Sequence, residues 1–458
     1  MIDKGLIKRY NIAGPRYTSY PPANHFSEKY TEKDFVQLLD SSNSQNPSNI
    51  SIYLHVPFCP QICHFCGCNT SLLKNRSDVE DYFQSLEKEL HKVSSHLDKQ
   101  RKISQIHWGG GTPNSISFRW IERIMDLIYS AFSVEPYAEI AMEVNPAYLE
   151  LSDLIRLQKM GFNRISIGVQ DFKAGLLRKL NRKPSKYPIE DLYRTARKSG
   201  FKSVNIDLIY GLPGQTRKEF FESVQRAITI APERLVTFSY AHVPWFKENQ
   251  KQLENFHIPD ADEKLDMLET SYKMLTGAGY IPIGMDHYAK PDDELAVALK
   301  NKELHRNFQG YCTRETTGQV YAFGATGISQ LTDGYFQNVR EPGQYIRLLN
   351  EDKFPVFRGY VLSSKEKIIR TTINELMCNH EIDIDDIAER FGITKEGWMQ
   401  TLNFNEDKII PFLKDELIIY NENKIQVTPK GFFLIRNIAM AFDPMLENNR
   451  ENRYSKTI

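Results

Sequence analysis

The stretch SIYLHVPFCPQICHFCGCNT, residues 51–70, joins a β-rich apolar run directly to a loop that holds four of the chain's six cysteines. Prolines, a glycine and an asparagine surround Cys59, Cys63, Cys66 and Cys68, and these residue types favour a loop. A single cysteine is most often a buried, inert residue. Four cysteines so close together indicate a shared function instead.

The same β-rich texture recurs along the chain. From residue 50 to about 290, short β-rich runs alternate with longer stretches of helical periodicity. The expected strands are 51–57, 104–111, 139–146, 163–170, 203–211 and 235–244. Six βα units in succession predict parallel strands joined by right-handed helical crossovers.

Polar residues stand at or near the ends of several of these strands. Glu143, Gln170, Asp207 and the glycines after Trp108 occupy such positions. Their recurrence favours an α/β fold built on a partial (β/α)6 TIM-like barrel over a doubly wound sheet. In barrels of this kind the active site lies at the C-terminal rim of the strands.

Two segments flank the barrel, which we place at residues 49–345. Residues 1–48 are expected to form an N-terminal arm that covers the substrate and ends in a polar linker, SSNSQNPSN. Residues 346–458 are expected to form a small, mostly helical, winged-helix-like domain with a hairpin in ELIIYNENKIQVTPKGFF. Because this domain lacks a dense Lys/Arg stripe, a packing or lid role is favoured over nucleic-acid binding.

Composition excludes several classes of partner. The 458 residues are 41% hydrophobic and 25% charged, and Lys plus Arg and Asp plus Glu both number 58. This is the composition of an ordinary globular protein, without the charge excess of a nucleic-acid binder. The N-terminus has no secretory signal, and no apolar run is long enough for a membrane span. Six cysteines in so long a chain make no disulfide framework, so a reducing cytoplasm is expected.

Three interpretations of the cysteine loop compete. A disulfide pair is disfavoured in a reducing compartment. Structural zinc is a serious alternative, since zinc takes four thiolates, but such sites draw their ligands from separated knuckles. The third is an iron–sulfur cluster bound by Cys59-x-x-x-Cys63-x-x-Cys66. A [4Fe–4S] cluster normally takes four cysteines, so three leave one iron open for a small-molecule ligand.

The spacing C-x-x-x-C-x-x-C after the first strand of such a barrel resembles the radical S-adenosylmethionine (SAM) enzymes. The resemblance implies that Cys59, Cys63 and Cys66 hold one [4Fe–4S] cluster, whose fourth iron is chelated by the amino and carboxylate groups of SAM. An electron from the cluster would cleave the sulfonium to methionine and a 5′-deoxyadenosyl radical. WGGGTP, residues 108–113, looks like the family's glycine-rich segment that meets the cofactor's amino group.

Further motifs narrow the resemblance. GPRYTSYP at residues 14–21, GVQDF, NIDLIYGLPGQT, GMDHYAKPDDELA and LHRNFQGY are similar to oxygen-independent coproporphyrinogen III oxidases, and the similarity covers nearly the whole chain. It implies conversion of coproporphyrinogen III to protoporphyrinogen IX in haem (porphyrin) biosynthesis without oxygen. The radical would remove a hydrogen from the β-carbon of a propionate. Loss of carbon dioxide and one electron would leave a vinyl group, on two of the four propionates.

Carried over residue by residue, the resemblance predicts three groups of contacts. Two SAM molecules would be bound by Tyr53, Phe65, Gly110, Gly111, Thr112, Glu143, Gln170, Arg182, Asp207, Ala241 and Ile328. The substrate would be bound by Arg16, Tyr17, Tyr20, Arg306, Phe308 and Gln309. Cys68 matches the fourth cysteine of the family pattern and is expected beside the cluster, with Tyr53 and Gln309 as further catalytic residues.

The resemblance also implies partners: a reductant such as flavodoxin or ferredoxin, an electron acceptor of unknown identity, and a monomeric chain. Three alternatives remain at this point. A related haem chaperone would keep the cluster, but such chaperones typically lack a cysteine at the position of Cys68 and the GPRYTSYP arm. A radical SAM methyltransferase could act on another tetrapyrrole. A zinc-stabilised, winged-helix interaction protein would have no cluster.

Overall fold

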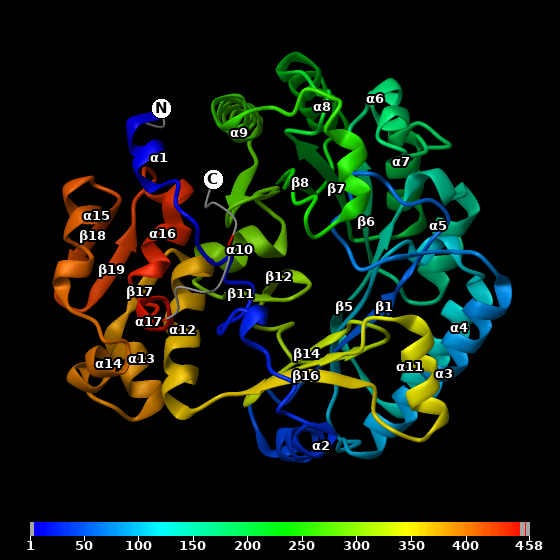
Figure 1. The fold of residues 1–458 in the computed structure, drawn as a ribbon, viewed down its shortest axis with the longest axis horizontal. Helices are drawn as coiled ribbons and strands as arrows, with labels where there is room; N and C mark the ends of the chain where they lie inside the picture. Colours follow the sequence, from blue (N-terminus) through cyan, green and yellow to red (C-terminus); the bar gives the residue numbers. More distant parts are fainter. Residues whose placement is uncertain (1–3, 449–453, 455–458) are drawn as a thin grey trace.

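The six expected βα units form the centre of one large sheet (Figure 1). In the computed structural model, which describes residues 4–448 and 454, the twelve strands of this sheet follow the order β16-β15-β14-β13-β1-β4-β5-β6-β7-β8-β10-β9. Neighbouring strands in the middle of the sheet are parallel: β13 (Gln319–Phe323), β1 (Ile50–Val56), β4 (Ile103–Gly110), β5 (Val134–Val144), β6 (Arg164–Gln170), β7 (Ser203–Tyr210) and β8 (Arg234–Ser239).

Amphipathic helices cover the outer face of these strands (Figure 1). They are α3 (Arg76–Ser95), α4 (Phe118–Ala131), α5 (Leu151–Lys159), α7 (Ile189–Ser199), α8 (Arg217–Ile230) and α9 (Ala261–Gly277), with the short α6 (Ala174–Lys179) after β6. Their apolar stripes and the strands build the main core, in which Trp108, Phe83 and Phe162 are fully buried. Burial of such side chains is the main stabilising contribution to a core of this kind.

Both ends of the sheet extend beyond the predicted barrel. Antiparallel strands β14 (Ile328–Leu331), β15 (Gly334–Asn338) and β16 (Val356–Val361) continue from β13, and β10 (His287–Ala289) and β9 (Ile281–Ile283) continue from β8. The order begins at β16 and ends at β9, so the sheet is open, as expected of a partial barrel. The predicted domain division assigns β16 to the C-terminal domain, whereas the structure includes it in the large sheet.

The C-terminal domain has its own apolar core. It contains α12 (Ser364–Asn379), α13 (Ile384–Phe391), α14 (Lys395–Thr401), α15 (Ile410–Lys414) and α16 (Ile435–Met440), with a small sheet of β17 (Glu381–Asp383), β19 (Lys424–Val427) and β18 (Ile418–Asn421). The expected hairpin is present as β18 and β19, and α16 follows it. Helices plus a three-stranded sheet agree with the predicted winged-helix-like form.

The N-terminal arm contacts both bodies. Helix α1 (Lys4–Tyr10) packs on the C-terminal domain, where the Tyr10 and Phe412 rings stack with centroids 5.4 Å apart. Helix α2 (Glu32–Ser41) packs on the main core through Phe35, Leu38 and Leu39. Shorter elements are β2 (Phe58–Cys59), β3 (Ser71–Leu72), β11 (Leu304–Asn307), β12 (Gly310–Thr313), α10 (Glu294–Lys300), α11 (Pro342–Asn350) and α17 (Met445–Asn448). Among the described residues, no helix combines the length and apolarity that a bilayer crossing needs.

Candidate active site

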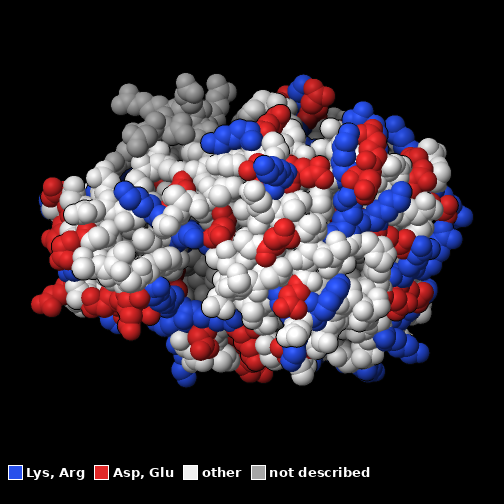
Figure 2. Space-filling view, turned by 90° about the horizontal axis from the view of Figure 1, so that it is seen from below, with Lys and Arg blue, Asp and Glu red and all other residues white. Residues whose placement is uncertain are grey.

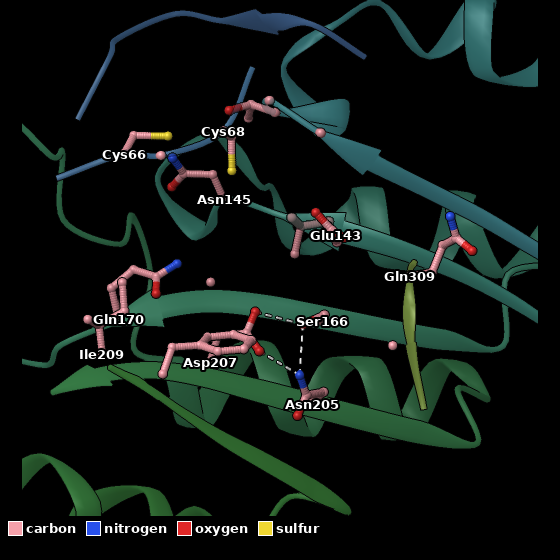
Figure 3. Close-up of a pocket in the computed structure, with 18 of the residues that line it drawn as sticks. Cys66, Cys68, Glu143, Asn145, Ser166, Gln170, Asn205, Asp207, Ile209 and Gln309 are labelled. Atoms are coloured by element: carbon pink, nitrogen blue, oxygen red, sulfur yellow. Dashed lines mark hydrogen bonds between the residues drawn. The ribbon is translucent and has the colours of Figure 1, made fainter. Parts of the chain in front are cut away.

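A cavity of about 610 Å³ runs through the barrel and opens at the C-terminal ends of the parallel strands (Figure 3). Each parallel strand from β4 to β8 contributes wall residues, including Gly110, Glu143, Gln170, Asp207 and Ser239. The volume lies within the range of roughly 300–1,000 Å³ found for small-molecule sites. The cavity therefore lies at the strand ends, where the sequence analysis places the site.

All four cysteines of the loop line this cavity. Figure 3 shows the sulfur atoms of Cys66 and Cys68 directed into it. Two donors from other segments reach the remaining sulfurs: Thr112 Oγ1 donates to Cys59 Sγ over 3.3 Å, and Arg182 Nη1 donates to Cys63 Sγ over 3.5 Å. Hydrogen bonds to cluster sulfurs are one of the means by which a protein sets a cluster's reduction potential.

The thiols differ in their electrostatic surroundings. Burial raises the pKa of Cys59 to about 11, whereas a hydrogen bond from the Cys68 thiol lowers the pKa of Cys66 to about 6. In residues 4–448 and 454 no three or more His, Cys, Asp or Glu side chains surround a point where a single ion would sit. In a [4Fe–4S] cluster each cysteine binds a different iron, so three thiols from one loop on the wall of one cavity fit that group.

Two glycines allow the segment after β4 to lie against the cysteine loop. Gly110 has φ of 105°, and a Cβ atom there would lie 2.6 Å from the His55 ring. At Gly111 a Cβ would meet the Phe58 carbonyl oxygen, also at 2.6 Å. Without these side chains, Thr112 N donates to Phe58 O over 2.9 Å, which brings Thr112 beside the cysteine that follows Phe58. The glycine-rich segment is thus required by close backbone approach.

Glu143, near the end of β5, is held by a histidine that the sequence analysis did not single out. His107 donates from Nε2 to Glu143 Oε1 over 2.9 Å. Burial lowers the pKa of His107, but the hydrogen bond and charge of Glu143 outweigh it, so this pKa ends above its ordinary value. Tyr53 stacks on His107 with ring centroids 5.9 Å apart. Tyr53 thus contacts His107 but is not itself part of the cavity lining, which includes His107 and Glu143.

Asp207 stands opposite on β7 and is held in the same way (Figure 3). Ser166 Oγ donates to its Oδ2 over 2.9 Å, and Asn205 Nδ2 donates to its Oδ1 over 2.6 Å. Burial raises the pKa of Asp207 to about 6, because the low-dielectric interior disfavours the charged carboxylate. Each carboxylate oxygen of Asp207 accepts one of these hydrogen bonds and keeps a further lone pair, which can accept from a hydroxyl or amino group of a ligand.

The segment that follows β8 is hydrogen-bonded to the backbone of the cysteine loop. Asn249 Nδ2 lies within hydrogen-bonding distance of the carbonyl oxygens of Cys63, His64 and Cys66, at 3.1, 2.9 and 3.2 Å. Gln250, which is 1% exposed, donates from Nε2 to Phe65 O over 3.2 Å. These amides pair with backbone carbonyls of a loop that has little regular structure of its own, where Cys63 O also accepts from Cys66 N over 3.1 Å.

Buried ion pairs close the lower end of the cavity. Arg164 Nε lies 2.7 Å from Glu139 Oε2, and Arg234 Nε donates to Asp293 Oδ1 over 2.9 Å. Gln105 Nε2 donates to Glu139 Oε1 over 3.0 Å. Paired charges tolerate burial where lone ones do not. The network therefore forms a polar floor, with the polar rim and the cysteine loop above it.

The structure brings most of the predicted site residues to this cavity. Those that line it are Arg16, Cys59, Cys63, Phe65, Cys66, Cys68, Gly110, Gly111, Thr112, Glu143, Gln170, Arg182, Asp207, Ala241 and Gln309. Tyr53, Arg306, Phe308 and Ile328 do not belong to its lining. Their roles stay predictions.

Tyr17 and Tyr20 also lie away from the cavity wall. Both are buried in the apolar core that the arm shares with the C-terminal domain, and Tyr17 donates to Asp443 Oδ2 over 2.9 Å. In this position they anchor the arm, while the exposed Arg16 between Pro15 and Tyr17 reaches the cavity. Direct contact of the two tyrosines with a substrate stays a prediction that this geometry does not support.

Several residues of the site were not predicted from the sequence, among them His107, Ser166, Asn205 and Asn249. The first three are polar positions in strands that also hold buried apolar residues such as Ile106, Ile165 and Ile206. Side chains alternate between the two faces of a strand, so Ser166 and Asn205 share a face with Gln170 and Asp207. That alternation was a usable signal. Asn249 lies in a short 3-10 helix, Glu248–Leu253, and nothing in the local sequence marks it as a site residue.

Comparisons with known proteins agree with this geometry. A model of the radical SAM superfamily matches residues 53–227, and a model described as the HemN C-terminal domain matches residues 362–434. The chain is 41% identical to the oxygen-independent coproporphyrinogen III oxidases of Escherichia coli and Salmonella typhimurium, covering all of this chain and 98% of each relative. It is 37% identical to the Synechocystis enzyme of that name, over 99% of this chain and 97% of that one.

A solved structure shows the same architecture. The coproporphyrinogen III oxidase HemN from Escherichia coli, described as a radical SAM enzyme, superposes with a TM-score of 0.89 at 38% sequence identity. The match covers 97% of this chain and 99% of the solved chain. The arm, the open barrel and the C-terminal domain are therefore all shared with that protein.

Proposed function

The chain belongs to the family of oxygen-independent coproporphyrinogen III oxidases, and from this membership we propose how its cavity performs the family's reaction. It is a radical SAM oxidoreductase that converts coproporphyrinogen III to protoporphyrinogen IX by oxidative decarboxylation of two propionates. The observation that carries the proposal is the loop of four cysteines facing a barrel cavity, beside a glycine-rich segment that packs against it.

Cys59, Cys63 and Cys66 would hold the [4Fe–4S] cluster. When bound, the cluster and SAM together supply a 5′-deoxyadenosyl radical, which can break an unactivated C–H bond that acid–base groups cannot. Thr112 and Arg182 donate hydrogen bonds to Cys59 and Cys63 and so orient these thiolates. The partial positive charge of the Thr112 hydroxyl hydrogen and the full positive charge of the Arg182 guanidinium stabilise the anionic form of the two sulfur atoms.

The wall residues would bind and orient SAM. Glu143 and Asp207 present carboxylate oxygens from two strands, each already fixed by neighbouring donors, so that they suit an amino group and ribose hydroxyls. Fixed acceptors reduce the reorganisation that accompanies binding. The position of Arg182 among buried groups suits the cofactor's carboxylate as well as the cysteine loop.

Arg16 and Gln309 would meet the substrate. Arg16 carries a positive charge to the cavity from the arm, and a guanidinium pairs with a propionate carboxylate in a bidentate geometry. Gln309 reaches the same cavity from the hairpin of β11 and β12 (Figure 3). Because the arm and the hairpin are separate from the cofactor wall, the substrate would lie above SAM and shield it from water.

Several finer points are part of this proposal. The cavity would hold two SAM molecules, and the chain would act as a monomer. The reductant would be a flavodoxin or a ferredoxin, and a further acceptor would take the electron released at each decarboxylation. A reducing cytoplasm would suit the six free cysteines of the chain.

The test is an anaerobic assay with the reconstituted cluster, reductant, SAM, coproporphyrinogen III and a cell-extract electron acceptor. We expect protoporphyrin and a tricarboxylate intermediate after oxidation and chromatography, with 5′-deoxyadenosine formed alongside. Cys63→Ala should abolish both products. S-adenosylhomocysteine in place of 5′-deoxyadenosine would identify a methyltransferase, and haem transfer without porphyrin conversion would identify a chaperone; either result would reject the proposal.

A further inference from the structure

The segment that follows β6 packs directly against the cysteine loop. His64 N donates to Leu180 O over 3.0 Å, Gln61 Nε2 donates to Asn181 Oδ1 over 2.6 Å, and Asn181 Nδ2 donates to Ile62 O over 2.9 Å. A shared apolar cluster continues this contact, with Leu176, Leu180 and Leu253 beside Cys63 and Phe65. The surface of this segment is therefore the surface that adjoins the cluster site.

This segment is strongly basic, although the chain as a whole has no net charge. Residues 173–186 contain six Lys and Arg and no Asp or Glu. Lys173 pairs with Glu222, Lys186 pairs with Glu150, and Arg182 is turned to the cysteine loop. The other three, Arg178, Lys179 and Lys183, are exposed, and none forms an ion pair with any residue in the described part of the chain.

One face of the molecule shows how the charges are distributed on a mixed surface. Over much of the face drawn in Figure 2, Lys and Arg side chains lie among Asp and Glu side chains. An uncompensated group of three cations beside the cluster site differs from this pattern. Local fields of one sign speed the encounter with a partner of the opposite sign.

Exposed apolar side chains also lie in segments that adjoin the cysteine loop. Trp245 and Phe246 are 76% and 64% exposed, and Leu72 is 47% exposed. The loop that carries Trp245 and Phe246 is tied to the cysteine loop by Asn249 and by Lys247, whose Nζ donates to Cys68 O over 2.8 Å. Exposed apolar side chains gathered at a functional site commonly mark an interaction surface.

We propose that Arg178, Lys179 and Lys183, together with Trp245 and Phe246, form the docking surface for an acidic flavoprotein that delivers one electron to the cluster. The inference rests on the proposed function, because only a redox-active cluster requires a donor. One electron passes from the reduced flavin to the oxidised cluster, and no bond is formed or broken.

Two features select this partner. Electron tunnelling falls steeply with distance, so a donor must dock close to the cysteine loop, and both the cations and the aromatic pair belong to segments that contact this loop. The cations match an acidic protein, and the exposed aromatic pair matches the apolar edge of a flavin ring. Small, charge-guided contacts with a few apolar residues are typical of transient electron-transfer complexes.

The test measures cluster reduction itself, by anaerobic stopped-flow absorbance, with the reconstituted full chain and photoreduced flavodoxin as the probe. In Arg178→Glu/Lys179→Glu/Lys183→Glu we expect the second-order rate constant at low ionic strength to fall about tenfold or more. Added salt should slow the parent and speed the variant, because attraction has become repulsion. Trp245→Ser/Phe246→Ser should lower the rate at every ionic strength.

A matched control carries the same change in net charge at the opposite end of the strands. Lys159, Lys198 and Lys202 are exposed and lie near the starts of β6 and β7. Lys159→Glu/Lys198→Glu/Lys202→Glu should keep the parent rate. Equal rates for the two triple variants would overturn the docking surface. Dithionite, a small reductant, should reduce all variants alike, and a loss there would mean that the cluster site itself was damaged, which would also overturn it.

The two proposals fail in distinguishable ways. If flavodoxin reduces the cluster in a patch-dependent manner but no porphyrin is converted, the docking surface stands and the substrate assignment fails. If porphyrin is converted with dithionite while the patch has no effect on flavodoxin, the function stands and the docking surface fails. Patch-dependent reduction by a [2Fe–2S] ferredoxin, with none by flavodoxin, would overturn the assignment to a flavoprotein.

Discussion

At the scale of single residues, the cavity is made of polar side chains that stand on otherwise buried strands. Glu143, Ser166, Asn205 and Asp207 face the barrel interior, while their neighbours along each strand pack under the helices. Each of these side chains makes at least one hydrogen bond, although Asn205 Oδ1 is buried without a partner among the described residues. Their orientations are therefore fixed before a ligand binds.

Removing the charge of Glu143 tests this arrangement. Glu143→Gln keeps the size of the side chain but replaces a charged acceptor, and a hydrogen bond to a charged group contributes about 1.5–3 kcal/mol. We expect the affinity for SAM, measured by anaerobic equilibrium dialysis, to fall roughly 10- to 100-fold. Glu122→Gln, at an exposed ion pair with Arg156, is the control. An unchanged affinity would mean that the charge of Glu143 does not contribute to SAM binding and that Glu143 only orients His107.

Glu89 of α3 makes stability depend on pH. It is 2% exposed and accepts hydrogen bonds from Tyr345 Oη (2.6 Å), Gly324 N (2.8 Å) and Asn338 Nδ2 (2.7 Å). Desolvation outweighs these donors and raises its pKa to about 7, above the ordinary 4.5. Between these values the folded protein keeps a proton that the unfolded chain has lost, so stability falls as pH rises from about 4.5 to 7.

The expected size of this loss is roughly 3 kcal/mol, from about 1.4 kcal/mol for each pKa unit. Glu89→Gln cannot titrate, so its free energy of unfolding should change less between pH 5 and pH 7.5 than that of the parent, measured in urea. Glu80→Gln, at an exposed position of the same helix, should behave as the parent does. A parent-like pH dependence in Glu89→Gln would contradict the assignment.

At the scale of elements, the cysteine loop is held by three segments that follow three different strands. The glycine-rich segment after β4 donates to its start, the segment after β6 binds its middle, and the loop after β8 binds five of its carbonyls. A loop without regular structure has no ladder of its own to satisfy its backbone. Its shape therefore depends on these neighbours.

Asn249 is the residue whose removal should loosen the loop most selectively. Asn249→Ala deletes the amide that spans three carbonyl oxygens, so the cysteines should hold the cluster less firmly. We expect faster loss of iron from the reconstituted protein in an anaerobic challenge with a chelator, followed by absorbance. Asn255→Ala, exposed in the same loop, should lose iron at the parent rate. Equal rates for both variants would mean that Asn249 does not position the loop.

At the scale of the whole molecule, the C-terminal domain places the arm over the barrel. Arg436, 6% exposed, donates from Nη2 to Gly14 O over 2.6 Å and from Nε to Pro15 O over 3.1 Å. Asn437 Nδ2 donates to Tyr10 O over 2.7 Å. These contacts fix the backbone immediately before Arg16. If Arg16 binds the substrate as proposed, the domain acts on substrate binding through the arm.

Arg436→Met should release the arm while it preserves much of the buried volume. We expect the KM for coproporphyrinogen III to rise about tenfold, as for the loss of one or two hydrogen bonds to a charged group. Cleavage of SAM without substrate should stay at the parent rate, and trypsin should cut near Arg16 more readily. Arg390→Met, in an ion pair with Glu375 on the same domain, is the control. Parent-like KM and proteolysis would contradict this role of the arm.

The sequence by itself determined the βα core, the rim position of the site and the cysteine loop. Apolar runs such as 163–170 and 203–211 form β6 and β7 within a residue of their expected bounds, because local hydrophobic periodicity specifies them. The proposed cluster ligands and the glycine-rich segment were singled out because their residues stand close together in short segments that resemble motifs of the family. Glu143, Gln170 and Asp207 followed from their positions at the ends of strands.

Only the tertiary structure decided which distant segments meet. Strand β13 pairs with β1 although more than two hundred and fifty residues separate them, and β16 joins the large sheet rather than the C-terminal domain. Tyr17 and Tyr20 pack under the C-terminal domain, and Asn249 reaches the cysteine loop. Such contacts arise from the burial of apolar surface and the pairing of buried polar groups across the whole chain. A local pattern specifies an element, and the partner of that element depends on the shape of the complete core.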